Sequence, residues 1–381
     1  MIDDELTMIP GPSPVHRRIL AALAQPTVSH QAPGFLQAFR ECLEDLREVA
    51  GSASAQPFVF AGGGTLSMEV ALVNVVRPGE TILVISQGHF GDRYAELASA
   101  FGIDCDVLQC EWGQVAPPEE LERLLKDNSY AAVTITHVDT STGACTPAAD
   151  YCSLLRGREE MVILDGVCAT GGVPEPFEEW GIDVLLTAPQ KALGVPPGLA
   201  ITIFSERALA KRKSLEAVPA FYADIHRWLP VMENPGRYFS TPCVNQILAL
   251  GEGLKIILAE GLEARFGRHR RLARAVRAGL AAMGLRHLTA DDCLADTLSV
   301  VLYPEGVDDA AFRSNMLQGG VMVAGGIGPV AGKVFRLGHM GNIDVQEIAV
   351  ALATIENSLI SLGVAIDPGT ALAAASSFFK E

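Results

Sequence analysis

The sequence lacks the features that define several large classes of protein. No stretch of about 18 residues is apolar and free of charge, so no transmembrane helix is expected. Basic residues are in deficit, with 29 Lys and Arg against 45 Asp and Glu, and the net charge of −16 disfavours nucleic acids and anionic membranes as partners. The N-terminal MIDDELTMIPG has neither the basic nor the apolar region of a signal peptide, so we expect a cytoplasmic protein.

Motifs for metals and nucleotides are also missing. The eight cysteines are scattered and no two form a Cys-x-x-Cys pair, which predicts reduced thiols and no metal site. A glycine-rich segment is present, but it matches neither Gly-x-Gly-x-x-Gly nor the Gly-Lys-Ser/Thr of a Walker motif. A dinucleotide site is therefore disfavoured.

The chain is long, and the signals for strands and helices alternate along its first two thirds. Its 381 residues are 49% hydrophobic, which predicts two domains with sizeable cores. Strands are expected at 58–60, 81–86, 105–108, 131–136, 161–165, 184–187 and 199–204, and helices at 19–24, 35–49, 66–76, 94–101, 118–126 and 148–156. Such alternation predicts an α/β fold with a largely parallel sheet covered on both faces, with ligands bound at the carboxyl ends of its strands.

The C-terminal third has a different pattern. Helices are expected at 242–259, 262–283, 309–318 and 345–362, and strands at 297–302 and 333–337. We therefore predict an N-terminal arm over residues 1–18, a large domain over 19–255 and a smaller α+β domain over 256–381. The small, polar tail after Asp367 is expected to be mobile.

One lysine stands out in the segment VLLTAPQKALGVPPGLAITIF, residues 184–204. Lys191 lies between two apolar strands, with Ala192, Leu193 and Val195 around it and no acid close in sequence. An amine in apolar surroundings is a competent nucleophile and base. A surface-loop lysine whose charge reaches water fits the same pattern.

The pair Gln190-Lys191, followed by Pro-Pro-Gly at 196–198, resembles the cofactor-lysine segment of class V aminotransferases. The resemblance is closest to the alanine–glyoxylate and serine–pyruvate aminotransferases, and it extends from Ile9 to Arg336. It implies a fold-type I enzyme of pyridoxal 5′-phosphate (PLP), with a mostly parallel seven-stranded-type sheet in the large domain. It also implies that Lys191 forms the Schiff base with PLP.

PLP needs an acid for its pyridine nitrogen, and Asp165 in VILDGVCATGG is the candidate. It ends an apolar strand, so its carboxylate is expected at the strand mouth, where an ionised acid would keep the ring protonated. An Asp that merely begins a loop is the simpler interpretation of the same residue. By resemblance, Val167 packs on the far side of the ring.

A phosphate pocket is expected at Gly62-Gly63-Gly64-Thr65, which opens a helix. Helix N-termini offer free N–H groups and a partial positive charge, and the Thr65 hydroxyl adds a donor. Gly63 replaces a hydroxyl residue of the family, which puts one side-chain contact in doubt. By resemblance, Gln190 is a further hydrogen-bond donor to the phosphate. A plain strand–helix turn would have the same pattern.

Further contacts come from the resemblance. Phe90 would stack on the PLP ring, and Thr140 would hydrogen-bond the ring oxygen or the phosphate side. Tyr238 and Thr241 match residues that reach the PLP phosphate of the neighbouring subunit. The resemblance therefore implies a homodimer with shared active sites.

The predicted substrate anchor is Arg336, because a guanidinium binds a carboxylate through two parallel hydrogen bonds. An arginine on the outer face of an edge strand is the alternative. Gly11 would face the substrate, because the family folds the N-terminal arm over the site. His30, His137 and His339 could line the pocket, although a structural role is the better expectation for each.

Together these residues predict a PLP-dependent aminotransferase. It would move the amino group of alanine or serine to glyoxylate or pyruvate by a ping-pong mechanism. Other donors within the family are ureidoglycine, an aminophosphonate and pyridoxamine, and Phe239-Ser240 is the position at which we expect donor preference to be set.

Two other classes fit the sequence less well. A lyase such as a cysteine desulfurase usually has His-Lys at the cofactor lysine and a reactive Cys on a mobile C-terminal loop. Here Gln190 precedes the lysine and Cys293 is the last cysteine. A cofactor-free α/β binding protein is disfavoured, because every cofactor contact has a candidate residue.

Overall fold

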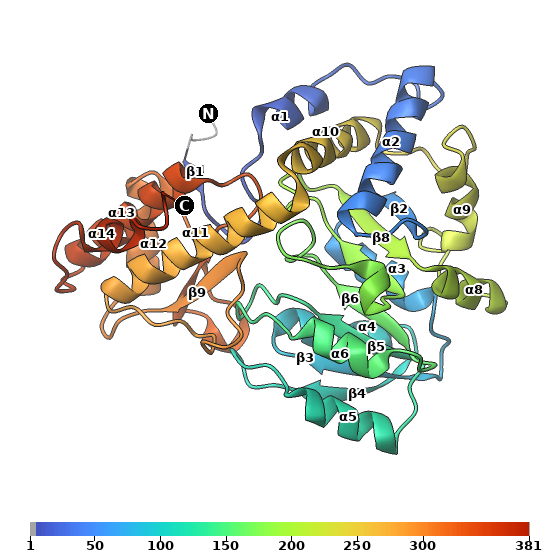
Figure 1. The fold of residues 1–381 in the computed structure, drawn as a ribbon, viewed down its shortest axis with the longest axis horizontal. Coiled ribbons are helices and arrows are strands. Elements are labelled where there is room, and N and C mark those ends of the chain that lie inside the picture. The colour runs from blue at the N-terminus through green and yellow to red at the C-terminus, as the bar shows by residue number, and fades with distance from the viewer. Residues whose placement is uncertain (1–4, 381) are drawn as a thin grey trace.

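A computed structural model describes residues 5–380, and its centre is a seven-stranded sheet (Figure 1). In spatial order the strands are β2 (Gln56–Ala61), β8 (Leu199–Phe204), β7 (Val184–Thr187), β6 (Met161–Asp165), β5 (Ala132–Thr136), β3 (Thr81–Ser86) and β4 (Asp104–Gln109). The five strands from β7 to β4 are parallel, and β8 runs antiparallel to both of its neighbours. The predicted, largely parallel sheet is confirmed.

The direction of β8 follows from the chain before it. Parallel neighbours need a crossover connection, usually a helix, whereas β7 and β8 are joined by a helix-free segment that contains Lys191 and Pro-Pro-Gly. The strand therefore returns antiparallel. The segment remains at the carboxyl end of β7, where a ligand of a parallel sheet is expected.

Both faces of the sheet are covered, as its sequence periodicity requires. In β3, Ile82 and Val84 pack in one core, and Leu83 and Ile85 pack in a second core on the opposite face. The helices of this region are α1 (Arg17–Leu23), α2 (Pro33–Val49), α3 (Gly64–Val73), α4 (His89–Ala100), α5 (Pro118–Asp127), α6 (Ala148–Leu155), α7 (Phe177–Trp180), α8 (Glu206–Ser214), α9 (Ile225–Glu233) and α10 (Val244–Glu260). The blue α1 and α2 lie beside the gold α10 in Figure 1.

The C-terminal elements build a separate core to one side of this sheet (Figure 1). They are α11 (Leu262–Ala282), β9 (Leu298–Leu302), α12 (Asp309–Gln318), β10 (Val321–Met322), β11 (Ala324–Gly325), the 3₁₀ helix η1 (Gly328–Val330), β12 (Val334–Gly338), α13 (Val345–Ser361) and α14 (Thr370–Ala375). β12 lies between β11 and β9 and is antiparallel to both. The predicted domain boundary at residue 255 falls inside α10, and the division into domains stays a prediction.

The N-terminal arm contacts this C-terminal region. Strand β1 (Leu6–Thr7) pairs in parallel with β10, and the Gly338 N–H donates to the Met8 carbonyl at 2.7 Å. The last two residues of the predicted arm lie in α1, which begins at Arg17. Residues 1–4 of the predicted arm lie outside the described residues.

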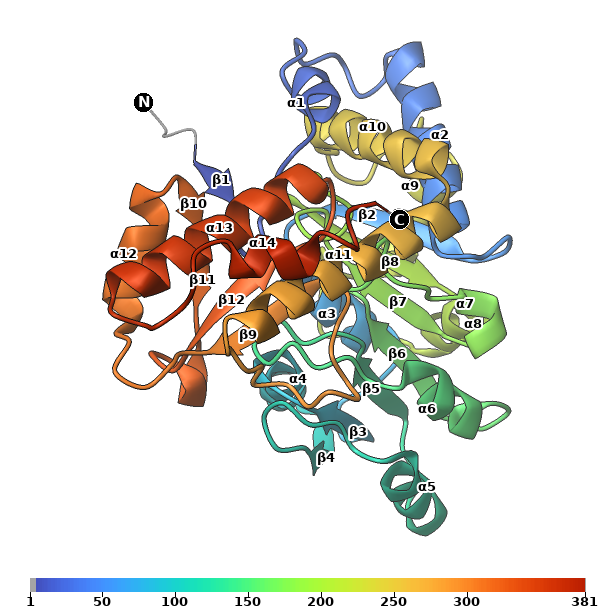
Figure 2. The same ribbon diagram turned by 60° about the vertical axis from the view of Figure 1, so that its left-hand side comes forward.

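Two local expectations were wrong. The tail is not loose throughout, because α14 packs along α11 with Ala371 and Ala375 buried (Figure 2). Alanines at positions i and i+4 give a weak hydrophobic signal, which explains the error. Helix α4 begins at His89 rather than at Tyr94, because a carboxylate described below holds its first turn. None of the helices within residues 5–380 has the length and apolarity needed to cross a membrane.

The contact between the N-terminal arm and β12 can be tested at Gly338. A Cβ at this position would lie 2.3 Å from the Ile9 carbonyl oxygen, which is a backbone atom of the arm. We expect Gly338→Ala to push the arm off β12 and to lower the free energy of unfolding by about 1–3 kcal/mol, measured by urea denaturation.

Gly267→Ala is the matched control. Gly267 lies exposed in α11, and a Cβ there meets nothing within 4 Å. This variant should gain about 0.5–1 kcal/mol from helix propensity. Equal stability of the Gly338→Ala protein and the wild type would contradict a tight arm contact.

Candidate active site

A cavity of about 280 Å³ lies where β5 and β6 end. Thr136 and Asp165, the last residues of these two strands, both line it. The predicted site residues that line the cavity are Gly11, Gly64, Thr65, Phe90, Thr140, Asp165, Val167, Gln190 and Lys191. Sequence segments that are far apart thus meet in one place, as parallel strand ends require.

The Lys191 amine is held by the N-terminal arm. Its Nζ donates to the Pro10 carbonyl at 2.6 Å, and the Ser13 hydroxyl donates to the Lys191 carbonyl at 2.7 Å. Gly11 has φ +131°, and a Cβ there would lie 2.5 Å from Lys191 Cδ. The arm can pass this close to the lysine only because residue 11 is glycine.

Asp165 is a buried carboxyl group with few compensating contacts. The side chain is 3% exposed, and its Oδ1 accepts the Val167 N–H at 3.0 Å. Burial raises the pKa of Asp165 to about 7, although the Val167 N–H and the Lys191 charge act in the opposite direction. A cation placed beside this group would favour its ionised form.

The N-terminus of α3 is open toward the cavity. Gly63 is its N-cap, extended and without a side-chain cap, so Gly64 and Thr65 present backbone N–H groups that no cap occupies. Gly63 itself does not line the cavity, whereas Gly64, Thr65 and Gln190 do. The buried Gln190 Oε1 has no hydrogen-bond partner, which leaves the amide available to a ligand.

The N-terminus of α4 is closed by contrast. Asp139 Oδ2 accepts the Phe90 N–H at 2.9 Å, and Oδ1 accepts the Ser141 N–H at 2.8 Å and the Ser141 hydroxyl at 2.6 Å. The Ser141 hydroxyl oxygen in turn accepts the His89 N–H. This clamp fixes Phe90 at the edge of the cavity. Asp139 was missed from the sequence, although the Asp-Thr-Ser run is typical of a side-chain-stabilised turn.

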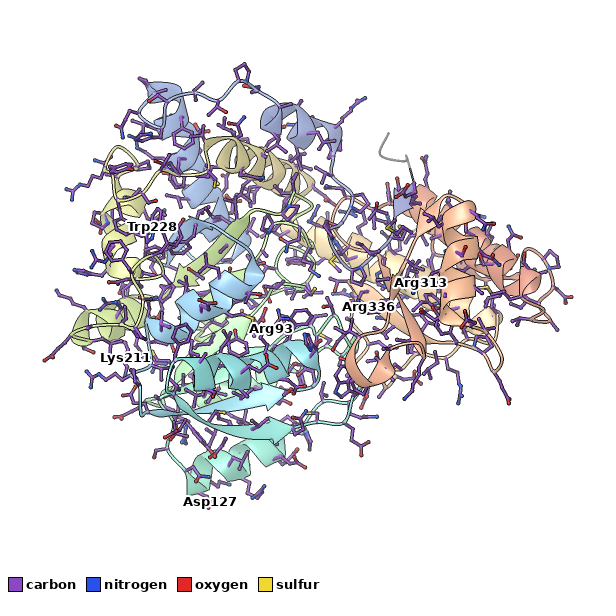
Figure 3. The ribbon with its side chains drawn as sticks, turned by 180° about the vertical axis from the view of Figure 1, so that it is seen from behind. Arg93, Asp127, Lys211, Trp228, Arg313 and Arg336 are labelled. Carbon is purple, nitrogen blue, oxygen red and sulfur yellow. The ribbon has the colours of Figure 1, made fainter. Side chains whose placement is uncertain are left out.

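Arg336 lies on β12 and does not line the cavity. Its Nε donates to the Gly325 carbonyl at 2.8 Å and its Nη1 to the Thr140 carbonyl at 3.2 Å. Burial lowers the pKa of Arg336. Figure 3 shows Arg336 on the orange ribbon and Arg93 on the turquoise α4, both toward the middle of the molecule. Through Thr140 the guanidinium reaches the wall of the cavity.

Tyr238 and Thr241 lie outside the cavity of their own chain. Tyr238 is 63% exposed, its hydroxyl lies 3.3 Å from Thr241 Oγ1, and its ring lies 5.5 Å from that of His30. Phe239 packs against Phe221 and Trp228 instead. Neither Phe239 nor Ser240 lines the cavity in the described chain, so the contacts within one chain do not show how they would select an amino donor.

The three candidate histidines do not line the cavity. His137 lies 2.7 Å from Glu175; burial lowers its pKa, but hydrogen bonds to Cys145 and Glu175 overcome this and raise it to about 10. His339 is fully buried, which lowers its pKa to about 3, and its ring contacts Ser299 and the Asp296 carbonyl. His137 and His339 thus have structural partners.

Other lining residues were not anticipated from the sequence. They are Pro12, Met68, Arg93, Thr136, Val138, Cys168 and Pro197. Arg93 could have been suspected, because it follows Phe90 by one helical turn and therefore shares its face.

The surroundings of the cysteines and acids bear on the alternatives. Cys293 is buried, and burial raises its pKa to about 11, which does not suit a reactive thiol on a loop. Within residues 5–380, no group of three or more His, Cys, Asp or Glu side chains could hold a metal ion.

The chemistry of these groups fits PLP. The cavity combines an amine, a buried carboxyl group, an uncapped helix N-terminus and an aromatic ring. These match an aldehyde, a pyridine nitrogen, a phosphate and a flat ring. The unpartnered Gln190 Oε1 is an acceptor, so it fits a ligand group that donates a hydrogen bond.

Comparison with known proteins identifies the family. A family model described as aminotransferase class-V matches residues 16–340. The L-aspartate–glyoxylate aminotransferase of Paracoccus denitrificans is 33% identical over 380 residues, covering 98% of this chain and 96% of the relative. The serine–glyoxylate aminotransferase of Methylorubrum extorquens is 32% identical over 383 residues, covering 98% and 95%.

A solved structure has the same architecture over the whole chain. The ureidoglycine–glyoxylate aminotransferase of Bacillus subtilis superimposes with a TM-score of 0.95 and 31% identity, covering 100% of this chain and 99% of the other. The fold-type I architecture and the resemblance seen in the sequence are thereby confirmed. This chain belongs to the class V aminotransferases, and its cofactor is pyridoxal 5′-phosphate.

Proposed function

We propose that the protein transfers the amino group of a small amino acid, alanine or serine, to glyoxylate or pyruvate by a ping-pong mechanism. The observation that carries the proposal is that the Lys191 amine and the buried Asp165 carboxyl group line one cavity. The names of the three relatives described above all include glyoxylate, which supports it as the acceptor. Their donors differ, and ureidoglycine is the second candidate donor because of the match to the Bacillus subtilis structure.

Bound PLP supplies an aldehyde for an amine and an electron sink for Cα–H cleavage. In the proposed roles, the Lys191 Nζ takes the proton from the substrate Cα and returns it as general base and acid. The ionised Asp165 keeps the ring nitrogen protonated. Phe90 and Val167, which both line the cavity, would contact the two faces of the ring.

The remaining predicted residues position the cofactor and the substrate. The α3 N-terminus at Gly63, Gly64 and Thr65, together with Gln190, would bind the phosphate, and Thr140 would hydrogen-bond the ring oxygen or the phosphate side. Arg336 would bind the substrate carboxylate, and Gly11 would face the substrate. Its Nη2 has no hydrogen-bond partner among the described residues, so one face of the fork is available.

We further propose a homodimer with shared active sites. Phe221 and Tyr238 are 66% and 63% exposed, and Phe221 packs against Phe239. Aromatic side chains exposed together are typical of a protein interface. Tyr238 and Thr241 would then reach the partner's cofactor phosphate. All eight cysteines are free thiols, which supports the proposed cytoplasmic location.

The donor can be identified from the visible spectrum. The purified protein with PLP should be yellow, and L-alanine or L-serine should bleach the band, with one equivalent of oxo acid released when glyoxylate is absent. L-aspartate, ureidoglycine and pyridoxamine are tested in parallel. Lys191→Ala is the control, and it should show no turnover. Normal turnover in that variant would contradict the mechanism, and bleaching by none of the amines would contradict the donor class.

Arg336 can be tested through KM. Because a charged hydrogen-bonded group contributes about 1.5–3 kcal/mol, Arg336→Gln should raise the KM of donor and acceptor by about 10–100-fold. PLP binding and the visible band should stay unchanged. Thermal unfolding is recorded alongside, because the side chain also holds two backbone carbonyls. An unchanged KM would place the anchor elsewhere.

Shared sites can be tested by mixing two inactive variants. Lys191→Ala and the double variant Tyr238→Ala/Thr241→Ala are unfolded together and refolded at equal concentration. Random pairing would place one intact site in half of the dimers, so about a quarter of wild-type activity should return. Each variant refolded alone serves as the control. No gain over those controls would mean that both groups act within one chain.

A further inference from the structure

Arg93 is a cation at the cavity wall for which the proposed function has no role. It lies on α4, is half-buried, and lines the cavity. No Asp or Glu of the described chain forms an ion pair with it, although most of the other half-buried arginines have such partners. A guanidinium held without a carboxylate partner is available to an anionic ligand.

The contacts of Arg93 place it at the phosphate end of the cavity. Its Nη1 donates to Thr65 Oγ1 at 3.2 Å, and Thr65 is in the first turn of α3, where the helix N-terminus is uncapped. Its Nη2 lies 3.0 Å from His89 Nε2. The guanidinium carbon lies 4.9 Å from the centre of the Phe90 ring, which orients the fork.

The other charged groups of the cavity do not supply a cation for a bound phosphate. A phosphate monoester carries a charge of about −1.5 to −2 at pH 7. Besides Arg93, the only cation that lines the cavity in residues 5–380 is Lys191, and the proposed function assigns its amine to the aldehyde. Arg336 does not line the cavity and donates to two carbonyls. Helix N–H groups and Gln190 are neutral donors, so they bind the phosphate without neutralising it.

We propose that Arg93 is a phosphate-binding residue that pairs with the cofactor phosphate beside the N-terminus of α3. The proposal rests on the PLP site of the proposed function and adds its cationic partner. A side-chain carboxylate of an acidic amino donor has the same chemistry as a ligand, but the hydrogen bond to Thr65 favours the phosphate. Arg93 also links the phosphate contact to Phe90, so one side chain would position both.

The test compares PLP with pyridoxal, which lacks the phosphate, as ligands of the apoprotein. Binding is followed by the change in absorbance and by quenching of protein fluorescence, so no turnover is needed. Arg93→Gln should weaken PLP about 10–100-fold and pyridoxal less than about twofold. Arg93→Lys keeps the charge and should recover part of the loss.

Arg123→Gln is the matched control. Arg123 is exposed on α5, the helix that ends at the Asp127 labelled in Figure 3, and it has no hydrogen bond or ion pair in the described chain. The variant loses the same charge and should bind both ligands as the wild type does. Inorganic phosphate should raise the melting temperature of the wild-type and Arg123→Gln apoproteins and have no effect on Arg93→Gln.

The outcomes separate the explanations. An equal loss of PLP and pyridoxal affinity would overturn the proposal and leave Arg93 as a support for Phe90. Unchanged PLP affinity with a raised KM for L-aspartate would assign Arg93 to a substrate carboxylate instead. If Arg93→Gln does not fold, the phosphate stabilisation of wild-type protein and of Arg93→Lys decides. Wild-type protein that binds PLP but transfers no amino group would refute the proposed function and not this site.

Discussion

The burial of one carboxyl group constrains the rest of the site. Asp165 ends β6 because a fully buried apolar strand stops there, and the fold gives its Oδ1 a single backbone N–H. Desolvation then raises its pKa to about 7, so the protein alone does not fully compensate the charge. The Lys191 charge offsets only part of this penalty, and a protonated pyridine ring beside the carboxylate would offset more of it. The ionised Asp165 carboxylate is therefore more stable when a cationic cofactor lies beside it.

Helices α3 and α4 both begin at the cavity, and their first N–H groups are used in opposite ways. Helix α4 presents its first N–H groups to Asp139, which turns that end into a rigid support for Phe90. Helix α3 has no such carboxylate, and its first turn remains available to an anion. The Asp139 carboxylate at the N-terminus of α4 excludes a phosphate there. The N-terminus of α3 has no such carboxylate and can bind one. Asp139 thus leaves the first turn of α3, and not that of α4, available to an anion.

Much of the sheet could be predicted from the sequence because most of its strands are buried on both faces. Runs such as 184–187 and 199–204 are continuously apolar and were predicted with the bounds that the structure has. Two-residue strands such as β1 and β10 carry no such pattern, since they depend on pairing between distant segments. The start of α4 was missed for a related reason. Its first turn is held by Asp139, which is far along the chain.

The site was predictable to the extent that its residues follow strands. Lys191 and Asp165 stand at strand ends, and their residue types limit what they can do there. Arg93 and Asp139 lie on a helix and in a loop where such residues are common, so their meaning comes from their partners in space. The resemblance to a family supplied Tyr238 and Thr241, for which the local sequence has no signal and the single chain shows no contact with the cavity.

The arm has a consequence for how the protein is made. Met8 and Pro10 are synthesised long before the Gly338 N–H that holds Met8. All strands of the central sheet have been translated by residue 204, when the segment that fixes the carbonyl beside the lysine is still missing. Contacts between such distant segments form late, because their loop-closure entropy is large. The nascent enzyme would thus carry every strand of the central sheet but an unfinished lysine pocket until translation has passed Gly338.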